Sequence, residues 1–164
     1  MKEVIKKINF KELIICILIP FIIGGLFSFL SGDISSIYEE FNKPFFAPPR
    51  IIFPIVWSII YFLLGISSYI VYQTIKDDKN DMDNKKIFIV YFLQLLINAT
   101  YTIILFRFKL YFISFLWTLL LIFVLIVMIS EFYEKNKLSA YLQIPYFIWC
   151  IFAAILNFFI CILN

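Results

Sequence analysis

The chain has 164 residues, of which 63% are hydrophobic and 21% aromatic, and its formal net charge is +3 at pH 7. Soluble domains contain about 45–50% apolar residues, so this composition excludes an ordinary soluble domain. The small, scattered positive charge argues against nucleic-acid binding, which calls for a clustered basic face. The chain has no histidine, which excludes a haem-ligating imidazole, a Ser-His-Asp triad and histidine metal sites.

Five stretches of the chain contain no Asp, Glu, Lys or Arg: 13–32, 51–75, 87–106, 110–130 and 138–164. An α-helix needs about 20 apolar residues to cross the ~30 Å hydrocarbon layer, and in lipid its backbone groups must pair within the helix. The sequence therefore predicts an all-α membrane protein, a single domain over 1–164 with five transmembrane helices. The expected spans are about 12–31, 50–75, 86–106, 110–132 and 138–163.

The basic residues predict how the chain is oriented. The amino-terminal tail and the second and fourth connections carry ten lysines, whereas the opposite side carries only Lys43, Arg50, Arg107 and Lys109. By the positive-inside rule the amino terminus should be cytoplasmic, in what we expect to be a bacterial cell membrane. The first apolar run is longer than the core of a signal peptide and no Ala-x-Ala cleavage site follows it, so we expect it to be retained.

The first span contains Pro20 and the pair Gly24 and Gly25, which predict a bend and the close approach of a neighbouring helix. The connection that follows mixes acidic residues with four aromatic rings: Tyr38, Phe41, Phe45 and Phe46. Because these rings would otherwise lie in water, we expect residues 32–49 to fold back over the bundle as a lid. Pro48 and Pro49 fit the first turn of the second span.

Three spans each carry a stripe of aromatic and polar residues on one helical face. The second span has Trp57, Tyr61, Gly65, Ser68 and Tyr72, at steps of four, four, three and four. The third has Tyr91, Gln94, Asn98 and Tyr101, at steps of three, four and three. The fifth has Pro145, Trp149, Ala153, Asn157 and Cys161 at uniform steps of four, beside Tyr146. The fourth span, with Trp117, resembles a packing or lipid-facing helix.

These stripes allow two interpretations. Buried amides in hydrocarbon need partners, so the stripes should face one another and enclose a pocket with flat apolar walls, which suits a planar hydrophobic ligand. Alternatively, the amides only join helices, and the aromatic residues only mark the membrane interface. No span contains an embedded carboxylate, which disfavours proton-coupled pumps and ion channels. Cys16, Cys150 and Cys161 show no ligand spacing and are expected to be inert thiols.

Three linked motifs resemble those of the TspO/MBR family, the tryptophan-rich sensory proteins and translocator proteins. The segment NKPFFAPPRIIFPIVWSIIYFLLG is similar to the family pattern K-P-x-(aromatic)-x-P-P followed by V-W-x-x-L-Y-x-x-x-G. QLLIN, from Gln94 to Asn98, resembles Q-L-x-L-N. PYFIWCIFAAILN resembles P-Y-x-x-W-x-x-F-A-x-x-L-N. The resemblance covers spans two to five in the family's order.

The resemblance implies a five-helix fold with a cavity under the loop between the first two spans. It also implies binding of tetrapyrroles such as protoporphyrin IX and of benzodiazepine-type ligands, without an obligatory cofactor. Trp57, Asn98 and Trp149 would line the pocket. The full set of candidate ligand-binding residues is Pro44, Phe46, Pro48, Pro49, Trp57, Tyr61, Gln94, Asn98, Tyr146, Trp149, Ala153 and Asn157.

Alternative functions remain open within the same resemblance. Trp57 and Trp149 match tryptophans through which some family members degrade porphyrin in light and oxygen, and this function would make the chain an enzyme. A third hypothesis is that the chain passively translocates small molecules. The carboxyl end lacks the tyrosine and the basic residue of a sterol-recognition pattern. The small-xxx-small pattern of the family's third helix is missing too, so the sequence leaves a homodimer open. The other expected partners are membrane lipid and planar small molecules.

Overall fold

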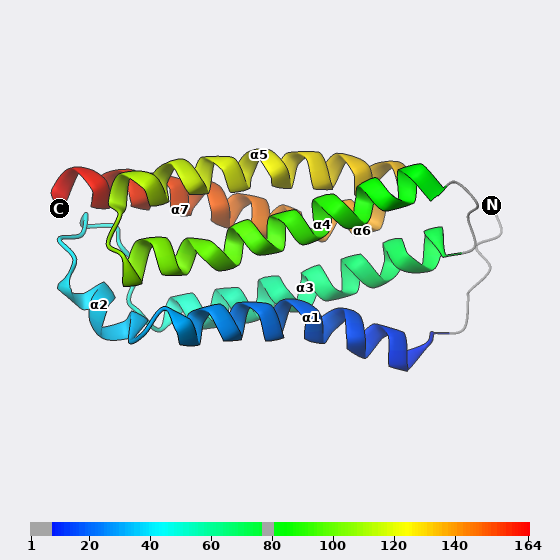
Figure 1. The fold of residues 1–164 in the computed structure, drawn as a ribbon, viewed down its shortest axis with the longest axis horizontal. Helices are drawn as coiled ribbons and strands as arrows, with labels where there is room; N and C mark the ends of the chain where they lie inside the picture. The colour runs from blue at the N-terminus through cyan, green and yellow to red at the C-terminus, as the bar shows by residue number, and fades with distance from the viewer. Residues whose placement is uncertain (1–7, 77–80) are drawn as a thin grey trace.

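The structure, a computed structural model, describes residues 8–76 and 81–164 as a bundle of long helices (Figure 1). The long helices are α1 (Phe10–Leu30), α3 (Ile52–Ile75), α4 (Asp81–Thr102), α5 (Tyr111–Lys135) and α7 (Ile144–Leu163). The π-helix η1 (Ile103–Arg107) continues α4, and α2 (Ile34–Glu40) and α6 (Lys137–Tyr141) are short. Five helical segments of the described chain are long and apolar enough to cross a membrane, which confirms the predicted five-span, all-α fold.

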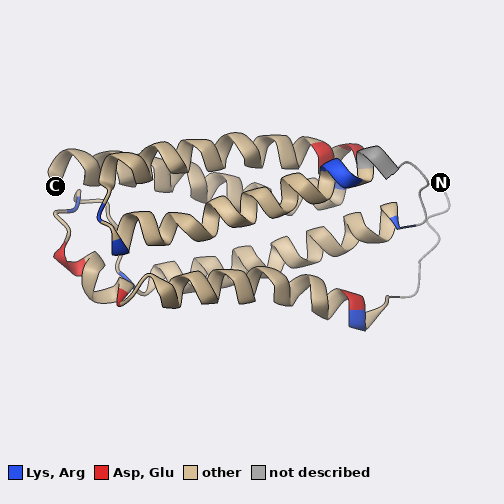
Figure 2. Ribbon diagram, in the orientation of Figure 1, with Lys and Arg blue, Asp and Glu red and all other residues tan. Residues whose placement is uncertain are grey.

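The charged residues of the described chain lie at the two ends of the bundle, and the middle of the helices carries none (Figure 2). At the end that holds the start of α1, Lys76 pairs with Glu12 at 3.4 Å and Lys86 pairs with Glu131 at 2.5 Å. At the other end, Lys109 pairs with Glu40 at 2.8 Å. This separation of charged ends from an apolar middle is the distribution that a lipid bilayer requires.

Two glycines set how closely α1 approaches α3. A Cβ atom on Gly65 of α3 would lie 2.5 Å from the Cα atom of Ile17, so the two helix backbones touch at this point. A Cβ atom on Gly24 of α1 would lie 2.4 Å from the ring of Tyr61, so the missing side chain makes room for that ring. Small residues at a helix crossing permit this contact in membranes, and here they fix the position of Tyr61.

Helix α5 lies at the centre of one side of the bundle, because it packs closely against both α4 and α7. Its buried face runs from Ser114 and Thr118 to Phe132. The structure shows both roles expected for the fourth span, because this face packs in the bundle while Phe112, Leu116 and Phe123 on the outer face are exposed. By contrast, α3 and α7 are not among the described helix pairs that pack closely, and they meet mainly through large side chains.

The segment between α1 and α3 differs from the sequence prediction in two details. It contains helix α2, which begins after Asp33, and the Asp33 carboxylate accepts a hydrogen bond from the backbone N–H of Ser36 at 3.1 Å. Such a side-chain cap stabilises a helix start. In addition, α3 begins at Ile52, so Pro48 and Pro49 precede its first turn; the N–H of Ile52 closes a turn onto the carbonyl of Pro49 at 3.0 Å.

Candidate functional site

A groove of about 540 Å³ lies between α3 and α7. It is lined by side chains from these two helices only: Val56, Ile59, Ile60, Ile144, Pro145, Ile148, Trp149 and Phe152. Ile59 and Ile148 at its edge are 54% and 61% exposed, so the groove opens sideways on the surface that faces lipid. Its volume falls within the range of about 300–1,000 Å³ that is typical of small-molecule sites.

Aromatic rings join the two helices beside this groove. The ring of Trp57 on α3 lies 6.0 Å from that of Tyr146 on α7 and 5.4 Å from that of Tyr61. The ring of Trp149 lies 5.9 Å from that of Phe53 and 5.3 Å from that of Phe152. The stripes of the second and fifth spans therefore meet, and they form a wall of flat rings.

Helix α4 supplies the polar groups behind this wall. The Tyr146 hydroxyl donates a hydrogen bond to Gln94 Oε1 at 3.0 Å, and Asn98 Nδ2 donates to the Tyr61 hydroxyl at 3.5 Å. Both amides are buried, and among the described residues Gln94 Nε2 has no acceptor. The third stripe therefore meets the other two, and its amides orient the tyrosine rings that contact Trp57.

The three tryptophans differ in how their indole N–H groups are used. Trp117 donates to the carbonyl of Ile97 and to the Thr100 hydroxyl, both at 3.0 Å. In the described part of the chain, neither Trp57 nor Trp149 has a hydrogen-bond acceptor. Both side chains are partly exposed, so each keeps an indole N–H that no described residue uses. Trp149 lines the groove, and Trp57 follows the lining residue Val56 in the chain.

Asn157 and Ala153 lie outside the residues that line the groove. Asn157 Oδ1 accepts a hydrogen bond from the Tyr101 hydroxyl at 3.0 Å, and its Nδ2 donates to Thr118 Oγ1 at 3.0 Å. Steps of four residues advance about 40° around a helix, so the stripe that places Trp149 at the groove turns Asn157 toward α4 and α5. The amide of Asn157 therefore joins helices and does not line the groove.

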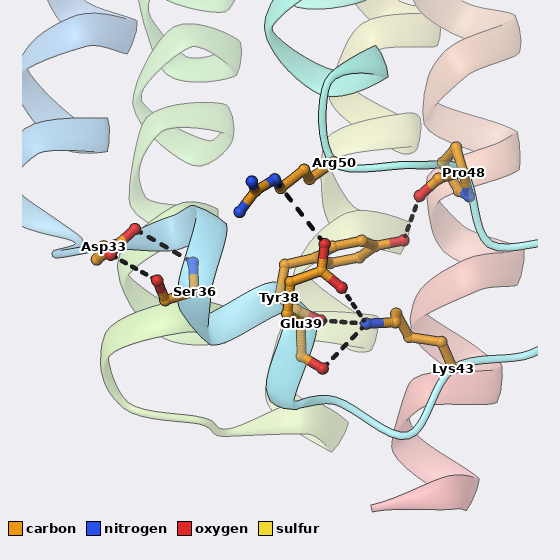
Figure 3. Close-up of polar contacts among 7 residues, drawn as sticks. All are labelled: Asp33, Ser36, Tyr38, Glu39, Lys43, Pro48 and Arg50. Atoms are coloured by element: carbon orange, nitrogen blue, oxygen red, sulfur yellow. Dashed lines mark hydrogen bonds and ion pairs between the residues drawn. The ribbon is translucent and has the colours of Figure 1, made fainter.

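A network of polar contacts holds the segment 31–49 in shape (Figure 3). The buried Tyr38 hydroxyl donates to the carbonyl of Pro48 at 2.9 Å, and Lys43 Nζ donates to the carbonyl of Tyr38 at 2.7 Å. Burial raises the pKa of Tyr38 to about 12, because the phenolate would lose its hydration. Glu39 accepts from Lys43 at 3.4 Å and lies 4.0 Å from Arg50.

Aromatic contacts attach this segment to the end of the bundle. Phe41 stacks on Phe106 with ring centroids 5.9 Å apart, and Phe46 lies 5.3 Å from Phe159 and 6.4 Å from Phe152. Through Phe152 the segment reaches the edge of the groove, whereas Pro44, Pro48 and Pro49 are not among its lining residues. The expectation that all four rings would be covered is wrong for Phe45, which is fully exposed.

Most of the groove lining was missed by the sequence prediction. Phe53 does not line the groove but contacts the ring of Trp149; it lies four residues before Trp57, so the spacing of the stripe could have identified it. Val56, Ile59, Ile60, Ile144 and Ile148 carry no such signal, because an aliphatic residue that lines a lateral groove looks the same in sequence as one that faces lipid.

The fold defines a class, that of multi-pass α-helical membrane proteins. Comparison with known proteins narrows it: the TspO/MBR family pattern matches residues 16–163, and the chain belongs to this family.

Similar proteins support this assignment. The chain is 31% identical over 157 residues to the "Tryptophan-rich protein TspO" of Archaeoglobus fulgidus, covering 95% of this chain and 99% of that protein. It is 26% identical to the protein of the same name from Bacillus cereus, covering 90% and 95% of the two chains. It is 27% identical to the "Tryptophan-rich sensory protein" of Cereibacter sphaeroides, covering 74% and 72%.

Proposed function

We propose that the chain binds a planar, mostly apolar tetrapyrrole, such as protoporphyrin IX, in the groove between α3 and α7. One observation carries this proposal: Trp149 lines the groove, the ring of Trp57 contacts Tyr146 on the facing helix, and neither indole N–H has an acceptor among the described residues. A flat macrocycle matches the flat rings of Trp149 and Phe152 in an otherwise aliphatic lining, and the unused indole donors match a ligand with acceptor groups.

The lining residues explain why such a ligand would be held without ionic contacts inside the membrane. All eight are aliphatic, aromatic or proline, so the macrocycle contacts only apolar surface there. The two carboxylates of protoporphyrin IX need a polar environment, and the exposed Arg50 lies just before α3, three residues from Phe53. A propionate that extends past the start of α3 would compete for this guanidinium with Glu39, which lies 4.0 Å from it.

Light-dependent degradation and passive translocation, the two alternative functions, would also begin with binding in this groove. It contains no acid or base among its lining residues, so it offers no general acid–base catalysis. Its lateral opening allows a hydrophobic ligand to enter from the lipid phase.

Narrowing the groove tests this proposal. Val56→Phe adds a ring to its α3 wall, so we expect the Kd for protoporphyrin IX to rise about tenfold, because overpacking costs about 1–3 kcal/mol. The Kd is measured in detergent from the change in the Soret absorbance band.

The matched control is Ile55→Phe. Ile55 neighbours Val56 in the chain, is 51% exposed and does not line the groove, so its replacement should leave the Kd within about twofold. Equal affinities of Val56→Phe and the unaltered protein would place the porphyrin elsewhere.

A further inference from the structure

A second cavity lies between α1, α3 and α4, at the end of the bundle opposite the segment 31–49. Its volume is about 300 Å³, at the lower limit of small-molecule sites, and it shares no lining residue with the groove. Its walls are mainly Ile and Phe side chains, among which lie the polar groups of Glu12, Ser68 and Tyr91. This cavity takes no part in the function proposed above.

The cavity opens toward lipid and closes toward the protein interior. Ile15 of α1 is 49% exposed and Phe92 of α4 is 48% exposed, and these two form its edge. On the inner side, Val71, Tyr91 and Phe132 are buried. A molecule dissolved in the bilayer can therefore enter between α1 and α4 without passing through water.

The inner wall presents an unused hydrogen-bond donor. Tyr91 is only 5% exposed, and its hydroxyl forms no hydrogen bond with any described residue. Ser68 is close enough to interact with the Tyr91 hydroxyl, although the two form no hydrogen bond of ordinary length, and the Ser68 hydroxyl donates its own proton to the carbonyl of Gly65 at 2.9 Å. A buried hydroxyl without a partner is destabilising, and Ser68 Oγ retains lone pairs that can accept. Together the two residues match a ligand group that both accepts and donates.

The outer end of the cavity favours a neutral ligand. Glu12 pairs with Lys76 at 3.4 Å and also accepts a hydrogen bond from Gln73. Within this pair the charges cancel, so neither Glu12 nor Lys76 offers an unpaired charge to a ligand headgroup. Ser68 lies eight residues before Lys76 along α3, which is about 12 Å deeper in the membrane.

We propose that this cavity binds a single-chain aliphatic alcohol. The ligand hydroxyl accepts from Tyr91 and donates to Ser68 Oγ, and its hydrocarbon chain leaves between Ile15 and Phe92 toward the bilayer. Its narrow chain suits the small volume, whereas the groove between α3 and α7 suits a broad, flat molecule.

Photolabelling in vesicles tests this proposal. The full chain is reconstituted in phosphatidylcholine vesicles and illuminated with a diazirine-bearing octanol, and the labelled residues are identified by mass spectrometry. We expect labels on the α1 and α4 residues of the cavity. Tyr91→Phe keeps the ring and removes the donor, so labelling there should fall about 3- to 10-fold. Ser68→Ala, which removes the acceptor, is a second variant with the same expected direction.

Two controls make the result specific. Tyr69→Phe changes a buried tyrosine of α3 outside the cavity, whose hydroxyl accepts from the N–H of Asn9 at 2.9 Å, and it should leave the labelling unchanged. A diazirine-bearing octane lacks the hydroxyl and should label the cavity several-fold less than the alcohol.

Equal labelling by octane and octanol, equal labelling of the Tyr91→Phe variant and the unaltered protein, or labels only in the groove between α3 and α7 would each overturn the proposal. Protoporphyrin IX binding should be the same in Tyr91→Phe as in the unaltered protein. A failure of the tetrapyrrole proposal therefore leaves this one standing, and the reverse also holds.

Discussion

Gly65→Ala should lower the free energy of unfolding by about 2 kcal/mol, although it adds only one methyl group. The added Cβ would lie 2.5 Å from Ile17 Cα and 3.1 Å from the Cys16 carbonyl oxygen, which are backbone atoms that no side-chain rotation can move. Helices α1 and α3 must therefore separate, and this opens the contact between Gly24 of α1 and the ring of Tyr61. Reversible unfolding in mixed micelles measures the difference.

Gly25→Ala is the matched control for this variant. Gly25 lies in α1, next to Gly24, and a Cβ there would have no atom within 4 Å. Alanine is the better helix former, so this variant should be unchanged or more stable by about 0.5–1 kcal/mol. If both alanine variants were equally stable, the close contact between α1 and α3 would be refuted.

Trp57→Ala and Trp149→Ala should each weaken protoporphyrin IX binding about 30-fold. Each substitution removes a large aromatic surface from the wall beside the groove, a loss of about 2 kcal/mol. The double variant should bind more than about 100-fold more weakly, since the two rings contact different neighbours, Tyr146 for Trp57 and Phe53 for Trp149. Soret absorbance gives the Kd without relying on tryptophan emission.

Trp117→Phe separates a groove effect from a general effect of losing a tryptophan. The Trp117 indole N–H is already bonded to Ile97 and Thr100, and its ring does not line the groove. Its replacement should change the Kd less than about twofold. An equal loss of affinity in all three variants would argue against a specific role of Trp57 and Trp149.

The five spans could be predicted because lipid excludes charge from the middle of each helix, which leaves uncharged runs in the sequence. The stripes of α3, α4 and α7 could be predicted because buried amides need partners, and Gln94 and Asn98 indeed contact Tyr146 and Tyr61. Helix α2 could have been anticipated from its cap, since Asp33 stands three residues before Ser36.

Other features depend on three-dimensional packing. The stripe from Trp57 to Tyr72 spans about 22 Å, too long for one pocket. Gly65 brings α1 against α3 midway along it, so Trp57 lies beside the groove and Ser68 and Tyr72 line the second cavity. The rotation of the α7 stripe likewise turns Asn157 toward Tyr101 and Thr118. Spacing alone does not show which part of a stripe meets which neighbour.

The central claim is that a tetrapyrrole lies against Trp149 and Trp57 in the groove between α3 and α7. Fluorine NMR of protein labelled with 5-fluorotryptophan tests it most directly, because the chain has only three tryptophans and a porphyrin ring current acts over a short range. Protoporphyrin IX should shift the resonances of Trp57 and Trp149, assigned by single Trp→Phe variants, and leave that of Trp117 in place. A shift confined to Trp117, or no shift at Trp149 at saturating ligand, would contradict the claim.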